Sequence, residues 1–501
     1  MKKAIKILVI LSSFILNAQN YVLDSTFANN GVFLYGSVGF PKKVIFENNK
    51  YYIVGSGVVA CVNYDGTMNS NFGTNGFSAF TTSNNYVVNG AKFYNNYIYV
   101  FGYINGPNTD FFIAKISLSG VLDPSFGING IVVQSFGGTY EELKDILFLN
   151  NGKILCVGDY RILDNWGYPK NPKIFISRYN NDGSIDASFD TNAFKILPIN
   201  NADKYTASNI LTYQNSIMIV GSLDYTYSAG NPTHDCDMLL VNIDENANII
   251  TSFGTNGIIR HHLLQAVQGG ISSAFNAKLI NNTDLYFIKD YSFTSGTTNQ
   301  LMRYNLTNNN IENLCYLDYS YHNYTVDTTN QKIYTTSIPN CGSCWRDFKI
   351  YRKNMDGTTD TTFNSNGYFV YNFPYASSDD NITAHFIHDD GRVLLVGNVT
   401  GIFVPGYFGI VRIIDQSLSL NANNLSEKAG VYPNPVEDFL NLELNTDEEV
   451  EEISIYDMTG KVVFYAKEWI PKINVSELKE DVYFIKIRTT GTHIIQKFIK
   501  K

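Results

Sequence analysis

The clearest pair of reactive side chains in this sequence is Cys341 and Cys344, which two residues separate. A CxxC pair can exchange thiols and disulfides, supply half of a zinc site or close a local disulfide. No second CxxC and no nearby histidine completes a zinc set, and no βαβ pattern surrounds the pair. We therefore expect a loop disulfide between Cys341 and Cys344. Cys61 and Cys156 lie within apolar runs and are predicted to be small core residues.

Possible metal ligands also gather at His234, Asp235, Cys236 and Asp237, and at His261 and His262. Isolated groups of this kind are usually solvated loop residues, so we predict no metal site. The sequence has no GxSxG, HExxH, Walker or Rossmann pattern. We accordingly predict no catalytic residue and no cofactor, and we favour a protein that is not an enzyme.

Aromatic side chains in the segments between predicted strands are the candidates for ligand contact. A flat aromatic face buries a large area at low entropic cost, which suits stacking on sugars or peptides. The same rings can instead pack against their own loops, and both interpretations stay open. The predicted loops are residues 103–110, 160–172, 222–237 and 290–300, and the candidate contacts are Tyr160, Trp166, Tyr168, Tyr225 and Tyr227.

The element that positions these residues is an internal repeat. A motif of the form LDxSFxxNG recurs, most cleanly at residues 122–130, and its phenylalanine stands at positions 27, 72, 126, 189, 253 and 363. The last interval is two periods long, so one degenerate copy is expected near residues 308–313. We expect the motif Asp to cap a turn, Asn-Gly to supply positive φ and the Phe to fill space between sheets. The alternative role of the Asp is in a calcium loop, but each copy offers too few carboxylates.

Each period contains an Asx-Gly hairpin and two further β-rich runs, which together predict four short strands. Four strands per repeat are typical of a β-propeller blade. Seven intervals, starting near residues 31, 76, 130, 193, 257, 312 and 367, predict seven blades, and the N-terminal motif would close the ring by completing the last. The alternative is an open β-solenoid. The repeat resembles the delta-60 repeat family, which implies a propeller over residues 20–420 and supplies no catalytic residues.

Charge density divides the chain near residue 420. Residues 425–501 hold 24 charged side chains in 77 positions, whereas the preceding 424 residues hold the other 59. We infer two modules joined by a linker at 421–430. The net charge of -9 argues against a nucleic-acid partner and against binding to anionic lipid.

The N-terminus has the order of a secretory signal peptide. Lys2, Lys3 and Lys6 precede an apolar run that ends at Leu16, and Ala18 provides a small residue for cleavage. A membrane anchor is the alternative, but the uncharged stretch is shorter than the roughly 20 residues that a spanning helix needs. We predict a signal peptide at 1–18, an exported protein and no transmembrane helix in the mature chain.

Residues 431–501 alternate apolar and polar positions with turns every 8 to 12 residues, which predicts a small Ig-like β-sandwich. The segment resembles the type A C-terminal sorting domain of the type IX secretion system of Bacteroidota; an unspecialised Ig-like module is the alternative. The resemblance implies recognition by the outer-membrane machinery, removal of the domain and a secreted or cell-surface product. The residues that carry it are Tyr432, Pro433, Asn434, Pro435, Gly460 and Lys461.

Together these features predict an all-β protein, a seven-bladed propeller followed by the sandwich, that binds a glycan or protein at the cell surface. The alternative function is a secreted hydrolase that acts on a glycan with carboxylates in the propeller channel. Two converging carboxylates in the channel would favour the hydrolase, and a channel plugged by apolar side chains would favour binding.

Overall fold

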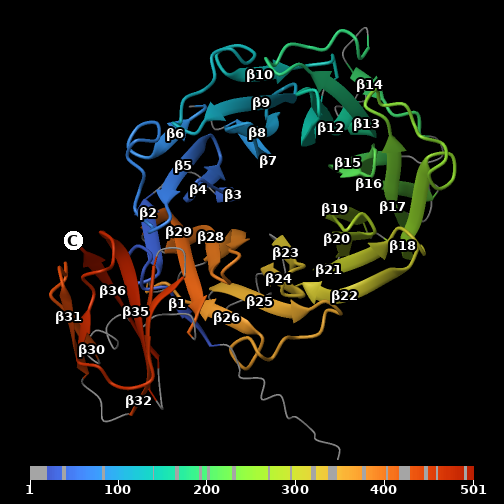
Figure 1. Ribbon diagram of the computed structural model, residues 1–501. Helices are drawn as coiled ribbons and strands as arrows, with labels where there is room; N and C mark the ends of the chain where they lie inside the picture. The colour runs from blue at the N-terminus through green and yellow to red at the C-terminus, as the bar shows by residue number, and fades with distance from the viewer. Residues whose placement is uncertain are drawn as a thin grey trace, which may run out of the picture. The chain divides into compact units, whose positions relative to one another are not determined.

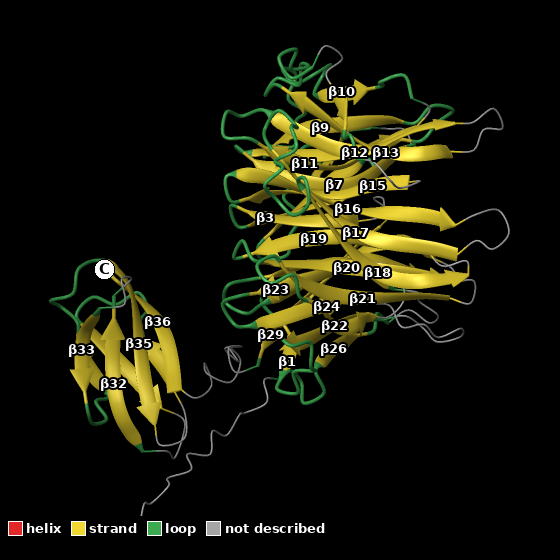
Figure 2. Cartoon of the chain, turned by 90° about the vertical axis from the view of Figure 1, so that its right-hand side faces the viewer, coloured by secondary structure: helices red, strands yellow, loops and turns green. Residues whose placement is uncertain are grey.

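The computed structural model describes residues 20–501 except 37–40, 82–84, 139, 164–168, 191–193, 200–203, 228–232, 269–270, 294–295, 318–322, 337–346, 375–379, 402–403, 417–428, 445–448, 458–460 and 490–492. The described residues form strands and turns and contain no α-helix (Figure 2). No helix of this part of the chain is therefore long and apolar enough to span a membrane. The chain divides into two compact units, one ending at Asp415 and the other beginning at Gln416.

The larger unit consists of antiparallel sheets arranged around a common centre (Figure 1). The first sheet contains β3 (Pro41–Glu47), β4 (Lys50–Gly55), β5 (Val58–Asn63) and β6 (Phe77–Ala79), and the second β7 (Tyr86–Tyr94), β8 (Tyr97–Ile104), β9 (Asp110–Ser117) and β10 (Ile131–Gln134). The third contains β11 (Tyr140–Phe148), β12 (Ile154–Leu163), β13 (Pro169–Tyr179) and β14 (Phe194–Ile196), and the fourth β15 (Lys204–Tyr213), β16 (Ser216–Tyr227), β17 (Thr233–Ile243) and β18 (Ile258–Gln268).

The remaining sheets follow the same order. The fifth contains β19 (Ile271–Ile280), β20 (Asp284–Phe293), β21 (Gly296–Asn305) and β22 (Ile311–Leu317), and the sixth β23 (Asn323–Asp327), β24 (Lys332–Thr336), β25 (Phe348–Asn354) and β26 (Tyr368–Tyr371). The last contains β27 (Asn381–Ile387), β28 (Val393–Gly401) and β29 (Val404–Asp415), and both β1 (Tyr21–Leu23) and β2 (Val32–Gly36) pair with β29. The prediction that the N-terminal motif completes the last sheet is thus confirmed.

The predicted starting points of the repeats are wrong by one strand. The short strand after each Asn-Gly was expected to open a new sheet, yet β10 pairs with β9 and so closes the preceding sheet. The cause is the motif turn, which folds the chain back: Asp123 N donates to Lys115 O, and Lys115 N in turn donates to Gly130 O. Each sheet therefore starts with the hairpin, which here begins at Tyr140.

The predicted variable loops are also wrong in extent. Residues 160–172 and 222–237 are largely the facing ends of β12 with β13 and of β16 with β17. In the second pair the ladder continues unbroken from Ile217 to Tyr227. Tyrosine and threonine favour a pleated surface, so these polar segments extend hairpins, although their amide and acidic residues resemble those of loops.

Turn formation by the motif Asp is confirmed, and its other oxygen has a partner that the sequence analysis missed. Asp24 Oδ1 accepts hydrogen bonds from Thr26 N at 3.0 Å and Thr26 Oγ1 at 2.6 Å, while Oδ2 lies 2.8 Å from Arg412 Nε. The same Arg412 guanidinium lies over the ring of the motif Phe27, 4.6 Å from its centroid. The corresponding ion pairs elsewhere are Asp123 with Lys115, Asp186 with Arg178 and Asp360 with Arg352.

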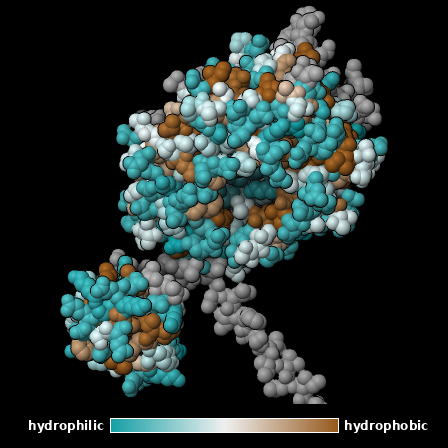
Figure 3. Space-filling view, turned by 45° about the horizontal axis from the view of Figure 1, so that its top comes forward, coloured by the Kyte–Doolittle hydropathy of each residue, from teal (hydrophilic) through white to brown (hydrophobic). Residues whose placement is uncertain are grey.

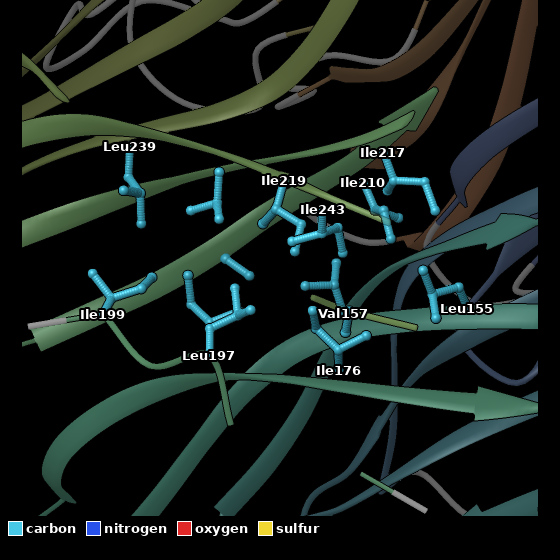
Figure 4. Packing of buried hydrophobic residues seen from close by; sticks show 14 of the residues in the cluster. Leu155, Val157, Ile176, Leu197, Ile199, Ile210, Ile217, Ile219, Leu239 and Ile243 are labelled. Carbon is cyan, nitrogen blue, oxygen red and sulfur yellow. The ribbon is translucent and has the colours of Figure 1, made fainter. Parts of the chain in front are cut away.

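Neighbouring sheets pack face to face through aliphatic side chains. In Figure 4, Leu155, Val157 and Ile176 of the third sheet lie opposite Ile219 and Ile243 of the fourth. Five of the six motif phenylalanines are buried as expected, and Phe253 is partly buried; Phe27, Phe72, Phe126 and Phe363 have no exposed surface. Cys61 and Cys156 are buried core residues, as predicted.

The smaller unit contains two sheets that share one apolar core. One sheet is formed by β30 (Ala429–Tyr432), β31 (Phe439–Leu444) and β34 (Lys472–Asn474), and the other by β33 (Val462–Ala466), β32 (Val450–Tyr456), β35 (Asp481–Thr489) and β36 (His493–Lys500). Leu440 and Leu442 of the first sheet join Ile453, Ile485 and Phe498 of the second in that core. The alternation read from the sequence therefore gives these strands their buried faces.

Candidate functional site in the central cavity

A cavity of about 930 Å³ lies in the larger unit where the first strands of the sheets meet. Its wall includes residues of β3, β7, β11, β15, β19, β23 and β27. Figure 3 shows the hollow in the surface of this unit. We call this feature the central cavity. It is not plugged by apolar side chains, and three carboxyl groups, Asp145, Asp159 and Asp290, are among its lining residues.

A β-bulge in the first strand turns a polar residue toward the cavity in sheet after sheet. In β7 the pairing register shifts between Val88 and Gly90, which leaves Asn89 as the extra residue. A bulge bends its strand and re-aims the side chain of the unpaired residue. The extra residues of the other bulged first strands also line the cavity: Lys42, Lys144, Ser208, Asn276, Ala277 and Thr383.

Glycines in the second strand make room for the bulges. A Cβ atom on Gly158 would lie 2.2 Å from Glu142 O, and one on Gly102 would lie 1.9 Å from Val87 O. Gly221 and Gly397 stand in equally close contact with the backbone of their first strands. In these four sheets the glycine of the second strand is thus required by the bulge beside it.

The charged groups of the wall are mainly cationic. They are Lys42, Lys43, Lys92, Lys144, Arg161 and Lys278 against Asp145, Asp159 and Asp290. The whole chain has the opposite balance, with 37 Lys and Arg against 46 Asp and Glu. The sequence analysis could not assign any of these residues to the cavity, because the bulges that direct them are not visible in the sequence.

Asp145 joins three sheets and has no free oxygen. Its Oδ1 lies 2.7 Å from Lys92 Nζ and accepts a hydrogen bond from Ile146 N at 2.9 Å. Its Oδ2 accepts hydrogen bonds from Ile210 N at 3.2 Å and Asn209 Nδ2 at 3.3 Å. This carboxylate therefore holds the second, third and fourth sheets in position.

Asp159 is buried and has two cations near it. Its Oδ1 accepts a hydrogen bond from Ala207 N at 2.8 Å, and its Oδ2 lies 3.7 Å from Lys144 Nζ and 3.5 Å from Arg161 Nη2. Burial raises the pKa of Asp159, although both cations act in the opposite direction. Asp159 is the carboxyl of the wall with the clearest electrostatic perturbation.

Lys43 of β3, Lys278 of β19 and His385 of β27 are a second set of titratable side chains, in which the lysine charges affect the pKa values of Lys278 and His385. Burial and the charge of Lys43 lower the pKa of Lys278 to about 7. Burial, with Lys278 and Lys43 adding to it, lowers the pKa of His385 to about 3. Lys278 Nζ donates to Tyr324 O, and His385 Nε2 lies 2.9 Å from Thr325 Oγ1. We call Lys43 and Lys278 the cavity lysines.

Of the residues predicted to contact a ligand, the structure describes the side chain of Tyr160 alone, and Tyr160 does not line the central cavity. Tyr160 is half-buried on β12, and its ring centroid is 5.9 Å from that of Phe194. Tyr225 and Tyr227 lie on β16, where they pair in register with Asp235 and Thr233. Trp166, Tyr168, Cys341 and Cys344 fall outside the described residues. Both the ligand contacts and the disulfide stay predictions.

The two groups of possible metal ligands share one sheet. Residues 234–237 lie on β17, and His261 and His262 lie on the adjacent β18 of the fourth sheet. His262 Nδ1 is 3.0 Å from Asp237 Oδ1. The described residues contain no group of three His, Cys, Asp or Glu side chains placed to hold a metal ion.

The predicted sorting motif opens the smaller unit. Asn434 Nδ2 donates to Lys497 O at 3.0 Å, and Asn434 Oδ1 accepts from Ile499 N at 2.9 Å, so this side chain fastens the opening segment to β36. Lys461 N donates to Asp457 Oδ1 at 3.0 Å in the turn between β32 and β33. Tyr432, Pro433 and Pro435 are exposed, and Gly460 lies outside the described residues.

Two family models match this chain, one in each of its two units. Residues 430–501 match the secretion system C-terminal sorting domain, and residues 149–189 match a β-propeller domain of unknown function, DUF5122. No curated protein sequence matches the chain. The chain is therefore a β-propeller protein with a sorting domain of the type IX secretion system, which indicates export to the cell surface or into the medium.

Solved structures resemble the chain only distantly. PorZ, described as an essential bacterial surface component of the type IX secretion system of Porphyromonas gingivalis, is 8% identical with a TM-score of 0.19, over 94% of this chain and 100% of PorZ. TolB from Acinetobacter baumannii is 12% identical with a TM-score of 0.32, over 64% of this chain and 62% of TolB. We base no functional conclusion on similarities this low.

Proposed function

We propose that this chain is an exported binding protein that holds its ligand in or around the propeller and is directed to the surface by its C-terminal domain. The observation that carries the proposal is the state of the central cavity, which is open and lined in part by charged and amide side chains, while Asp145 is fully engaged in structural contacts. A cavity of this size suits a small ligand. A carboxylate that already accepts from two backbone amides, one amide side chain and one lysine is poorly placed to act as a base.

We further propose seven blades in a closed ring, built from delta-60 repeats, followed by an Ig-like sandwich. Six four-stranded sheets and one five-stranded sheet in the described part of the larger unit support the count. Packing between β27 and β3, the first strands of the last and first sheets, supports closure. The proposed boundaries are 1–18 for the signal peptide, 20–420 for the propeller, 421–430 for the linker and 431–501 for the sorting domain.

A glycan hydrolase is the second candidate, and Asp159 is the observation that favours it. A carboxyl group whose pKa is raised by burial can hold a proton for a general acid. Its partner would have to be another carboxylate on the wall, and Asp290 of β20 lines the same cavity. Inverting and retaining enzymes both need two such groups, some 5 to 10 Å apart.

One experiment separates these functions. The chain without residues 1–19 is screened on glycan and peptide arrays and, in parallel, for release of reducing sugar from a panel of polysaccharides. Binding without sugar release supports the proposal. Sugar release that Asp159→Asn abolishes, while Asp356→Asn at an exposed turn leaves it unchanged, would replace binding by hydrolysis.

A further inference from the structure

We infer that the central cavity recognises an oxyanion group of a small polar ligand, a carboxylate, phosphate or sulfate, through the cavity lysines Lys43 and Lys278. The inference rests on the proposed binding function and adds the chemical class of the ligand and the residues that select it.

The first support is the local reversal of charge. Six cationic and three anionic side chains line the cavity of a protein whose net charge is -9. A concave surface lined by one sign of charge focuses the field and concentrates ligands of the opposite sign. The net negative charge of the chain would repel anions elsewhere, so the cationic lining makes the cavity a favourable place for an anion.

The second support is that the cationic groups differ in what they contact. Lys92 is paired with Asp145, while Lys144 is paired with Glu142 at 2.6 Å. Lys278 donates to the carbonyl of Tyr324, which uses one of its three N–H groups and supplies no negative charge. The side chain of Lys43 forms no ion pair or hydrogen bond within the described part of the chain, although the charge of Asp145 favours its protonated form. The two cavity lysines thus have the capacity to bind an anion.

The third support is electrostatic. Lys43 and Lys278 come from β3 and β19, yet the charge of Lys43 lowers the pKa of Lys278, and the charges of both lysines lower the pKa of His385 on β27. Asp145 favours the charged form of Lys43, but no carboxylate of the described residues does so for Lys278. Positive charge held in a partly desolvated wall with so little counter-charge is unfavourable. An oxyanion between these side chains supplies that counter-charge and favours protonation of Lys278.

The rest of the wall indicates a polar ligand. Neutral amide and hydroxyl groups, which include Asn89, Ser208, Asn209 and Asn323, alternate with the charged side chains. These groups can donate to and accept from hydroxyls, as a sugar acid or sugar phosphate presents.

The test measures binding of inorganic phosphate, sulfate and galacturonate to the chain without residues 1–19, by calorimetry and by thermal shift at constant ionic strength. Sodium chloride serves as the salt control. The variants are Lys43→Met, Lys278→Met and the double variant, with Lys278→Arg to retain charge. Lys173→Met, at an exposed lysine of β13, is the matched control.

We expect at least one of the three anions to bind. Loss of one charge-assisted contact should weaken that binding about tenfold or more in each Met variant. Lys278→Arg and Lys173→Met should retain it. Comparing the three anions identifies which oxyanion the site prefers.

The pH dependence gives a second readout. The charged group that acts on Lys278 is Lys43 of β3, and the other charged side chains of the same wall include Lys92, Asp145 and Asp290, with His385 neutral above about pH 3. Burial also lowers the pKa of Lys43, but it is the pKa of Lys278 that lies at about 7, so affinity for sulfate and galacturonate should fall between pH 6 and 9 in the wild type and fall less in Lys278→Met.

Two results would overturn the inference: no anion binds wild type beyond the chloride control, or binding is equal in the Met variants. If neutral glycans or peptides bind while anions do not, the inference fails and the proposed binding function survives. If nothing binds and polysaccharide is cleaved, the proposed function fails as well.

Discussion

Asp360→Asn removes the charge of a motif carboxylate while preserving its shape. Asp360 Oδ2 lies 2.7 Å from Arg352 Nε and 3.0 Å from Lys332 Nζ, and Oδ1 accepts from Thr362 N at 3.1 Å. The side chains of Asp360 and Arg352 are both 4% exposed. The substitution therefore leaves a buried guanidinium without its counter-charge, whereas the turn can still form.

The magnitude follows from two independent estimates. Breaking a buried ion pair by removing one partner costs about 3–5 kcal/mol. Burial opposes ionisation of Asp360, but Thr362, Lys332 and Arg352 outweigh it and lower its pKa to about 2. Lowering the pKa of a carboxyl group by roughly 2 on folding corresponds to a contribution of about 2.6 kcal/mol to the free energy of unfolding. Because Lys332 stays partly solvated, we expect the free energy of unfolding to fall by about 2–3 kcal/mol.

The control is Asp356→Asn in the same repeat. Asp356 Oδ1 accepts from Thr358 N at 2.9 Å and Thr358 Oγ1 at 2.6 Å, the same turn contacts, but the residue is exposed and forms no ion pair among the described residues. Urea unfolding of both variants, followed by fluorescence and circular dichroism, gives the comparison. Equal losses of stability in the two variants would refute the role of the buried ion pair.

The pH dependence of the same variant has a definite sign. The pKa of Asp360 is lower in the folded than in the unfolded chain, so its contribution to stability is complete above about pH 4 and disappears as pH falls through about 2. The stability difference between wild type and Asp360→Asn should therefore be constant from pH 7 to 5 and shrink towards pH 2. A difference that is unchanged at pH 2.5 would contradict this assignment.

Three further predictions concern other parts of the chain. Gly158→Ala places a methyl group against a backbone carbonyl and should lower the unfolding free energy by about 1–3 kcal/mol. Gly36→Ala should not lower it, because the new methyl group would lie 3.7 Å from its nearest neighbour. Urea unfolding of both variants gives the comparison. Deletion of residues 430–501 should leave the protein in the periplasm. In wild-type cells the exported protein should lack this domain, and full-length protein in the medium would argue against its removal. Mass spectrometry of cell fractions measures the location and the length of the protein. Cys341 and Cys344 should resist alkylation until a reductant is added, which peptide mapping measures.

Local patterns in the sequence determined the elements and the export signal. The Asx-Gly hairpins, the spacing of the motif phenylalanines and the alternation after residue 430 are short-range features, and a strand or turn depends mainly on residues within a few positions. The sorting domain could be identified for the same reason, since its motifs stand close together. The assignment of Asp24 to a turn also needed only its neighbour Thr26.

Long-range pairing could not be read in the same way. Nothing in the repeat indicates that Ile131 belongs to the preceding sheet, because that depends on hydrogen bonds to residues 113 and 114 across the motif turn. The ion pair of Asp24 with Arg412 likewise joins opposite ends of the propeller segment. Such contacts are decided by closure of the sheets and not by local preference.

The sequence by itself determined that this chain is an exported, repeat-built β protein with a separate C-terminal module. The tertiary structure alone decided what its central cavity presents. Bulges turn isolated lysines and asparagines of different sheets toward one space, and a bulge arises from the register between two strands, which no single strand records. Lys43 and Lys278 are more than 200 residues apart in sequence and act on the same cavity only because the sheets surround it.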